Sequence, residues 1–196
     1  MTSVRTSWRE HQIGRGFTQS LPADPSLLGR LDLTPYHIGH VALFHHVDLR
    51  VLWADTDPAG IVWFGVFCRY FEQAEEELFR ALGRDRTALL GQLRIFMPRT
   101  SMQSRFRSPA KLGDEIAIGV GVAAIADRRI EYAFDIRERG TDRLICEASY
   151  RVACVDQQTF APRAFPREIV ELLSPALIER EASVEREASA ERSNAR

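Results

Sequence analysis

Apolar and polar residues alternate along three stretches in the second half of the chain, at residues 115–124, 130–137 and 144–154. A period of two puts alternate side chains on opposite faces of a sheet, so each stretch predicts a strand with one buried face. Short turns that contain charged residues separate the stretches. Because such short turns join antiparallel neighbours, the pattern predicts a meander, with one further strand near residues 97–107.

A different period marks residues 64–82, where apolar side chains recur at the 3, 4 and 7 spacing of an amphipathic helix that stops at Gly83. Before it, residues 47–53 alternate as another strand. One long helix against an antiparallel sheet is an α+β architecture. The strand at 115–124 has one face of small residues that permits close approach of the helix or of a partner subunit, namely Ala117, Gly119, Gly121 and Ala123.

The candidate chemistry lies between the first strand and the helix, in the sequence Asp55-Thr-Asp57-Pro-Ala-Gly60-Ile-Val-Trp63-Phe64. Backbone N–H groups are free at a helix N-terminus, and the helix dipole is positive there. A bound carbonyl that develops negative charge is stabilised at such a position, and a carboxylate aimed at it completes a minimal acyl-transfer site. The alternative is structural, because Asp commonly caps a helix or tightens a turn.

The whole string resembles the active-site loop of the 4-hydroxybenzoyl-CoA thioesterase family of hotdog-fold enzymes. The loop of that family reads Asp-x-Asp-Pro-Ala-Gly followed by aliphatic and aromatic residues, and Tyr-Phe-Glu-Gln-Ala at residues 70–74 is also similar to it. The resemblance extends from about residue 44 to about residue 175. It implies a hotdog fold, in which a curved antiparallel sheet wraps one long central helix. It also implies hydrolysis of an acyl-CoA to free acid and CoA, with aryl-CoA thioesters such as 4-hydroxybenzoyl-CoA among the candidates.

The resemblance carries the catalytic carboxylate onto Asp57, acting as a nucleophile through a mixed anhydride or as a general base on water. It assigns polarisation of the substrate carbonyl to the backbone N–H of Phe64, where the family usually has Tyr. The missing hydroxyl removes any contact that a tyrosine side chain would make with the substrate. Gly60 is expected to permit the tight turn that brings the backbone close to the thioester.

Three residues are candidates for contact with the acyl group. Trp63 and Phe67 are expected to line an acyl pocket, although an aromatic residue on a helix face is more often part of the core. Glu72 matches a position where the resembling family has an acidic residue facing the pocket. The three glutamates at residues 75–77 indicate a solvated acidic side on the same helix, which is the alternative for Glu72.

Basic residues are expected to bind the pyrophosphate and the 3′-phosphate of coenzyme A. Arg128 and Arg129, in a turn between two predicted strands, match a basic pair of the resembling family. Arg105, Arg107 and Lys111 are further candidates for the same role. The alternative for all five is solvated charge without a ligand. No cofactor is expected apart from the CoA that forms part of the substrate.

Composition narrows the class of protein. A chain of 196 residues with 45% hydrophobic content can bury one sizeable core, and a net charge of −1 argues against a nucleic-acid or membrane surface built on bulk charge. Three cysteines without C-x-x-C spacing and a start without a signal-like pattern favour a reduced, cytoplasmic protein. All five histidines precede Asp55, and the adjacent His45 and His46 point to opposite faces of a strand, so no metal site is expected.

The chain is expected to contain one domain with two extensions. Residues 1–40 read as a weakly structured N-terminal extension, residues 41–178 as the hotdog thioesterase domain, and residues 179–196 as a charged low-complexity tail. The exposed edge strands of a hotdog sheet predict a homodimer or homotetramer. A different class stays open on the sequence alone: a non-catalytic hotdog protein that binds an acyl-CoA or acyl carrier protein, or an assembly-line thioesterase that acts on acyl carrier protein.

Overall fold

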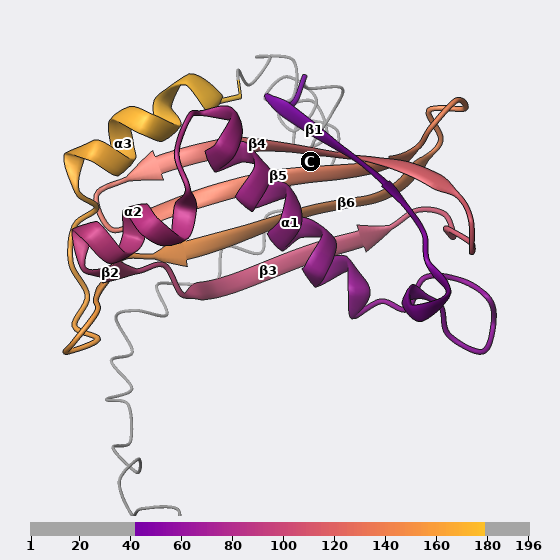
Figure 1. The fold of residues 1–196 in the computed structure, drawn as a ribbon, viewed down its shortest axis with the longest axis horizontal. Coiled ribbons are helices and arrows are strands. Elements are labelled where there is room, and N and C mark those ends of the chain that lie inside the picture. Colours follow the sequence, from indigo (N-terminus) through magenta and orange to yellow (C-terminus); the bar gives the residue numbers. More distant parts are fainter. Residues whose placement is uncertain (1–41, 179–196) are drawn as a thin grey trace, which may run out of the picture. The chain divides into compact units, whose positions relative to one another are not determined.

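The computed structural model describes residues 42–178, which form an antiparallel five-stranded sheet with one long helix lying across one face (Figure 1). The strand order is β1-β4-β5-β6-β3. None of the helices in this part of the chain is long and apolar enough to cross a membrane. The sheet and its helix consist of β1 (His45–Arg50), α1 (Val66–Ala81), β3 (Arg99–Phe106), β4 (Glu115–Ala126), β5 (Arg129–Glu138) and β6 (Leu144–Ala153). Shorter elements are a 3₁₀ turn (Trp53–Asp55), α2 (Arg86–Leu93), β2 (Ile95–Phe96), β7 (Val155–Asp156), α3 (Arg167–Leu173) and a second 3₁₀ turn (Ser174–Ala176).

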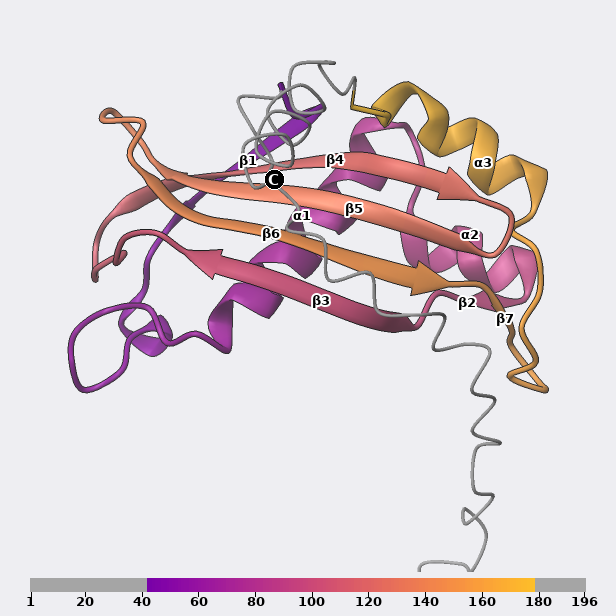
Figure 2. The same ribbon diagram turned by 180° about the vertical axis from the view of Figure 1, so that it is seen from behind.

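The predicted α+β architecture is confirmed. β4, β5 and β6 form the expected meander, and the strand expected near residues 97–107 is β3, which pairs with β6. Figure 2 shows the face of the sheet that α1 does not cover, with β1 and β3 at its two edges. The extension predicted for residues 1–40 and the tail predicted for residues 179–196 lie outside the described residues, so both stay predictions.

The apolar stripe of α1 packs on the inner face of the sheet. Phe71, Ala74 and Leu78 are at most 1% exposed, and the ring of Phe71 lies 5.0 Å from that of Phe134 on β5. Opposite Phe134 in the ladder stands Val120 of β4, which is fully buried on the same face. Each fully buried side chain of this kind stabilises the fold by about 1.5–3 kcal/mol. This packing fixes α1 on the sheet and sets where its N-terminus lies.

The small-residue face of β4 does not receive the helix. Gly119 and Gly121 point to the opposite side of the sheet, where a Cβ on Gly119 would lie 2.5 Å from Leu43 and a Cβ on Gly121 would lie 2.5 Å from Ile178. The prediction that α1 approaches this face is therefore wrong, because the larger side chains of the alternation face α1 instead. The side chains of Leu43, Asp135 and Ile178 occupy the space that the glycines leave. Contact with a partner subunit on this face stays a prediction.

The solvated acidic side expected for α1 is also wrong at one position. Glu75 is fully buried, whereas Glu76 and Glu77 are partly exposed. Its carboxylate lies 3.1 Å from Nε of Arg86 and 2.7 Å from the guanidinium of Arg99, and it accepts a hydrogen bond from the hydroxyl of Tyr150. Glu75 follows Phe71 by four residues and therefore shares the buried stripe, and the two arginines compensate its charge.

Two buried tyrosines give a matched test of this network. Tyr150 donates to Glu75, whereas the hydroxyl of Tyr132, also fully buried, has no hydrogen-bond partner among the described residues. We expect Tyr150→Phe to lower the free energy of unfolding by about 1–3 kcal/mol, because Glu75 loses a donor. Tyr132→Phe should be neutral or stabilising, because it removes an unpaired buried hydroxyl. Urea unfolding measures both, and equal losses in the two variants would contradict the assignment.

Candidate active site

The loop between β1 and α1 closes into a small hairpin. The N–H of Asp57 donates to the carbonyl of Ile61, and the N–H of Gly60 donates to the carbonyl of Asp57, both at 2.9 Å. Thr56 and Val62 pair as an antiparallel bridge across it. Gly60 has φ +75°, a conformation that favours glycine. The tight turn expected at Gly60 is present, and it presents Asp57 at the outer end of the hairpin.

The two carboxylates of the loop have different surroundings. Asp55 is 3% exposed, and its side chain accepts hydrogen bonds from Leu52 N (3.0 Å) and from the hydroxyl of Tyr70 (2.9 Å) and pairs with Arg69. Asp57 is only partly buried, and its Oδ1 accepts one hydrogen bond, from Ala59 N at 2.8 Å. Within residues 42–178 nothing donates to its Oδ2. Asp57 is therefore the carboxylate that is open to a ligand.

Among residues 42–178 no side chain caps the helix N-terminus next to the hairpin. Its N-cap is Gly65, so the alternative that Asp55 or Asp57 caps α1 is wrong. The other part of that alternative is present, because Asp57 tightens the turn by accepting Ala59 N. Trp63 N donates to the carbonyl of Asp55, and Val66 N donates to that of Trp63, both at 2.9 Å. The N–H of Phe64, between them, has no acceptor in the part of the chain that the structure describes. An unpaired donor and the positive end of the helix dipole thus coincide close to the Asp57 hairpin.

Aromatic side chains surround this end of α1. Trp63 is 50% exposed and Phe64 is 68% exposed, and their ring centroids lie 5.1 Å apart. Phe67 is buried, and its ring contacts Phe106 of β3, with 4.9 Å between ring centroids. Phe106 is itself 53% exposed. The sequence did not single out Phe106, because only the pairing of β3 with the sheet brings it beside a helix residue so distant along the chain.

Glu72 does not converge with Asp57. It lies on the exposed side of α1, six residues beyond the start of the helix and thus about 9 Å along the helix axis. Its carboxylate is 4.0 Å from the guanidinium of Arg99. Metal ligands do not gather here either, since no group of three His, Cys, Asp or Glu side chains suited to a metal occurs among residues 42–178.

The five basic candidates divide between the two ends of the sheet. Lys111 is next to the hairpin, because it pairs with Ile61 in an antiparallel bridge. Arg107, at the same end, is paired with Glu147 at 2.9 Å, and Arg105 stands opposite Glu147 in the ladder between β3 and β6. Arg128 and Arg129 follow the far end of β4, a strand of 12 residues that spans about 40 Å. In one chain the turn between β4 and β5, which contains these two arginines, lies at the end of the sheet opposite to the loop between β1 and α1 (Figure 1).

Comparison with known proteins gives the family. A model of the thioesterase-like superfamily matches residues 51–173. The chain belongs to this superfamily. The acyl-CoA thioester hydrolase YbgC of Escherichia coli O6:H1 is 29% identical over 122 residues, which make up 62% of this chain and 90% of that protein. The 1,4-dihydroxy-2-naphthoyl-CoA hydrolase of Thermosynechococcus vestitus is 29% identical over 94 residues, or 48% of this chain and 64% of that one.

Solved structures of the superfamily share the fold. Slr0204, a 1,4-dihydroxy-2-naphthoyl-CoA thioesterase from Synechocystis, matches with a TM-score of 0.61 at 19% identity, covering 66% of this chain and 94% of that one. The prediction of a hotdog-fold thioesterase is thus confirmed at the level of family and fold. The roles of individual residues in this member of the thioesterase-like superfamily stay predictions.

Gly65 gives a test of the aromatic wall. A Cβ at this position would lie 2.4–2.9 Å from three ring carbons of Trp63, and that half-exposed ring can move aside. We expect Gly65→Ala to shift the tryptophan emission and to change KM for the best thioester more than kcat, with no loss of stability. The control is Gly91→Ala in α2, where an added Cβ meets nothing within 4 Å. Unchanged emission and KM in Gly65→Ala would show that the ring of Trp63 does not line the site.

Proposed function

We propose that this protein hydrolyses an acyl-CoA thioester to the free acid and CoA at the hairpin of residues 56–62. The observation that carries the proposal is that Asp57, a partly exposed carboxylate, lies on the hairpin directly before the start of α1, where the N–H of Phe64 has no acceptor and no side chain caps the helix within residues 42–178. The names of the relatives support the same reaction, since YbgC is an acyl-CoA thioester hydrolase and others act on 1,4-dihydroxy-2-naphthoyl-CoA.

The mechanism uses two groups of this chain. The thioester carbonyl oxygen accepts a hydrogen bond from Phe64 N–H, which stabilises the negative charge that develops on that oxygen. Asp57 then attacks the carbonyl carbon, CoA leaves as the thiolate, and water hydrolyses the acyl-aspartyl anhydride. Alternatively, Asp57 takes a proton from water, the hydroxide adds to the carbonyl carbon, and collapse of the adduct expels CoA. Both routes need an ionised Asp57 and the same polarised carbonyl.

The aromatic surroundings favour an apolar acyl group, with aryl thioesters as the first class to test. The exposed rings of Trp63, Phe64 and Phe106 provide flat faces that stack on an aromatic ring. A screen across aryl-CoA and short, medium and long aliphatic acyl-CoA thioesters tests this preference. Parallel assays with thioesters of acyl carrier protein distinguish a CoA enzyme from an assembly-line thioesterase.

The active form is proposed to be a dimer or tetramer. β3 is an edge strand, and two side chains on its helix-facing side, Met102 and Phe106, are 47% and 53% exposed. An unpaired edge with exposed apolar side chains is suited to pairing with a second copy. Because Arg128 and Arg129 are distant from Asp57 in one chain, they can bind the CoA phosphates of this site only from another copy.

Light scattering tests the assembly. We expect a mass at least twice the 22.3 kDa of the single chain at micromolar concentration. Met102→Glu should lower this mass, because it places a charge on the apolar side of the β3 edge. A wild-type mass of 22.3 kDa would refute the dimer and any CoA site shared between copies.

Asp57→Asn tests the proposed function directly. Asn keeps the size of the side chain and the acceptor for Ala59 N, yet it is neither a competent nucleophile nor a base. We expect kcat to fall by about 10³-fold or more while binding of a non-hydrolysable CoA analogue survives. Released CoA is best measured by chromatography, since the exposed Cys68 reacts with thiol reagents.

The matched control is Asp114→Asn. Asp114 is a loop residue that, like Asp57, accepts one backbone N–H at 2.8 Å, in this case from Lys111. It should leave kcat within about threefold of wild type, because a merely structural aspartate tolerates asparagine. If Asp57→Asn also stays within about tenfold, a barrier change of only about 1.4 kcal/mol, Asp57 does not perform the chemistry.

A further inference from the structure

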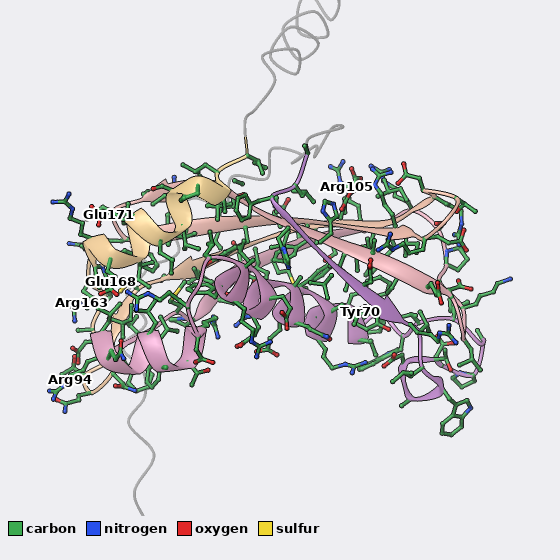
Figure 3. The ribbon with its side chains drawn as sticks, turned by 45° about the horizontal axis from the view of Figure 1, so that its top comes forward. Tyr70, Arg94, Arg105, Arg163, Glu168 and Glu171 are labelled. Atoms are coloured by element: carbon green, nitrogen blue, oxygen red, sulfur yellow. The ribbon has the colours of Figure 1, made fainter. Side chains whose placement is uncertain are left out.

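The proposed reaction leaves the buried carboxylate of Asp55 and its partners on α1 without a role. The carboxylate of Asp55 accepts hydrogen bonds from Leu52 N at 3.0 Å and from the Tyr70 hydroxyl at 2.9 Å, and it pairs with the guanidinium of Arg69. Arg69 and Tyr70 belong to the first turns of α1. Figure 3 labels Tyr70 on this helix. We call Asp55, Arg69 and Tyr70 the Asp55 clamp.

We propose that the Asp55 clamp positions the two reacting groups of the site relative to each other, and so acts as a positioning element for the thioesterase reaction. This inference rests on the proposed function, because in it the clamp fixes the distance between the carboxylate of Asp57 and the N–H of Phe64. Asp55 and Tyr70 do not touch the substrate, since they are 3% and 2% exposed, whereas the side chain of Arg69 is 55% exposed.

Asp55 connects both reacting groups to the helix. Its side chain is held on α1 by Tyr70 and Arg69, and its backbone carbonyl accepts the N–H of Trp63 at 2.9 Å. Trp63 directly precedes Phe64, and Asp57 follows Asp55 by two residues. The clamp is therefore connected to the chain two residues before Asp57 and one residue before Phe64, on opposite arms of the hairpin.

The rest of the fold is held by other contacts. The hairpin pairs with the loop before β4 through Ile61 and Lys111, and α1 is fixed on the sheet by its apolar stripe. Among residues 42–178 no side chain caps α1, and the polar side-chain contacts between the first turns of the helix and the preceding loop run through Asp55. Loss of one clamp contact should shift the hairpin against the helix start without unfolding the domain. A misplacement of about 1 Å costs about 10²-fold in rate.

Tyr70 is held as a protonated donor in the clamp. Burial, together with the hydrogen bond to Asp55, raises the pKa of Tyr70 well above its ordinary value, so its hydroxyl remains a donor. The guanidinium of Arg69 lies over the Tyr70 ring, 5.4 Å from its centre, which adds a cation–π contact between the two donors. Tyr70 and Arg69 thus both hold the carboxylate of Asp55 on α1.

Tyr70→Phe tests the proposal against a chemically matched control. The control is Tyr150→Phe, which also removes a buried hydroxyl that donates to a carboxylate. That carboxylate belongs to Glu75, which lies in the core between α1 and the sheet and is not part of the clamp. We expect kcat to fall about 10- to 100-fold in Tyr70→Phe with KM within about twofold. In Tyr150→Phe, kcat should stay within about threefold although the melting temperature falls. Equal kcat values in the two variants would overturn the clamp.

A double variant separates positioning from general damage. If the clamp acts through Asp57, adding Tyr70→Phe to Asp57→Asn should lower the residual rate by less than about threefold. The reason is that the effects of two substitutions on kcat are not additive when both residues act on the same catalytic step. If the fold-losses in kcat of the two single variants multiply fully in the double variant, the proposal is overturned. Arg69→Lys, which keeps the charge, should retain more kcat than Arg69→Gln.

The same measurements tell the two proposals apart. An active Asp57→Asn variant, or a wild-type protein that hydrolyses no thioester, overturns the proposed function and the clamp with it. An inactive Asp57→Asn variant beside a Tyr70→Phe variant with wild-type kcat overturns the clamp alone.

Discussion

The structure depends on the burial of one helix stripe against one sheet. The apolar side of α1 lies on the inner face formed by β4, β5 and β6, with Phe71 packed on Phe134 at its centre. Once this contact is made, the N-terminus of α1 must lie at the end of the sheet where β1 leaves it, and the connecting loop has to turn back within a few residues. The hairpin with Gly60 in a left-handed conformation is the local solution to that constraint.

Because of the same constraint, Asp55 and Asp57 have different roles although they are two residues apart. Asp55 faces the helix, is buried and is saturated with donors, whereas Asp57 faces outward with one oxygen unpaired among the described residues. A buried carboxylate with strong partners gives fixed geometry, and an open one is available for chemistry. Positioning and reactivity therefore come from neighbouring residues of the same type.

Local sequence patterns predicted most of the fold, whereas they could not predict contacts between residues that are distant in the sequence. The 3, 4 and 7 spacing predicted a helix over 64–82, and the structure has this helix at Val66–Ala81. The alternation of apolar and polar residues predicted the meander of β4, β5 and β6. Glu75 was misread as solvated because its partners Arg99 and Tyr150 are 24 and 75 residues away in sequence. The resemblance assigned the chemistry to Asp57, but the different burial of Asp55 and Asp57 could not be predicted from local patterns, since it depends on which carboxylate meets Tyr70. Phe106 joins the site only through the register of β3 on β6.

The central claim is that a thioester carbonyl binds between Asp57 and the start of α1. The most direct measurement is a crystal structure of the Asp57→Asn protein with its best acyl-CoA substrate bound and intact. The account predicts that the carbonyl oxygen lies about 2.9–3.0 Å from Phe64 N, with the carbonyl carbon facing the side chain at position 57. A thioester held elsewhere, with Phe64 N–H free of the carbonyl, would contradict it.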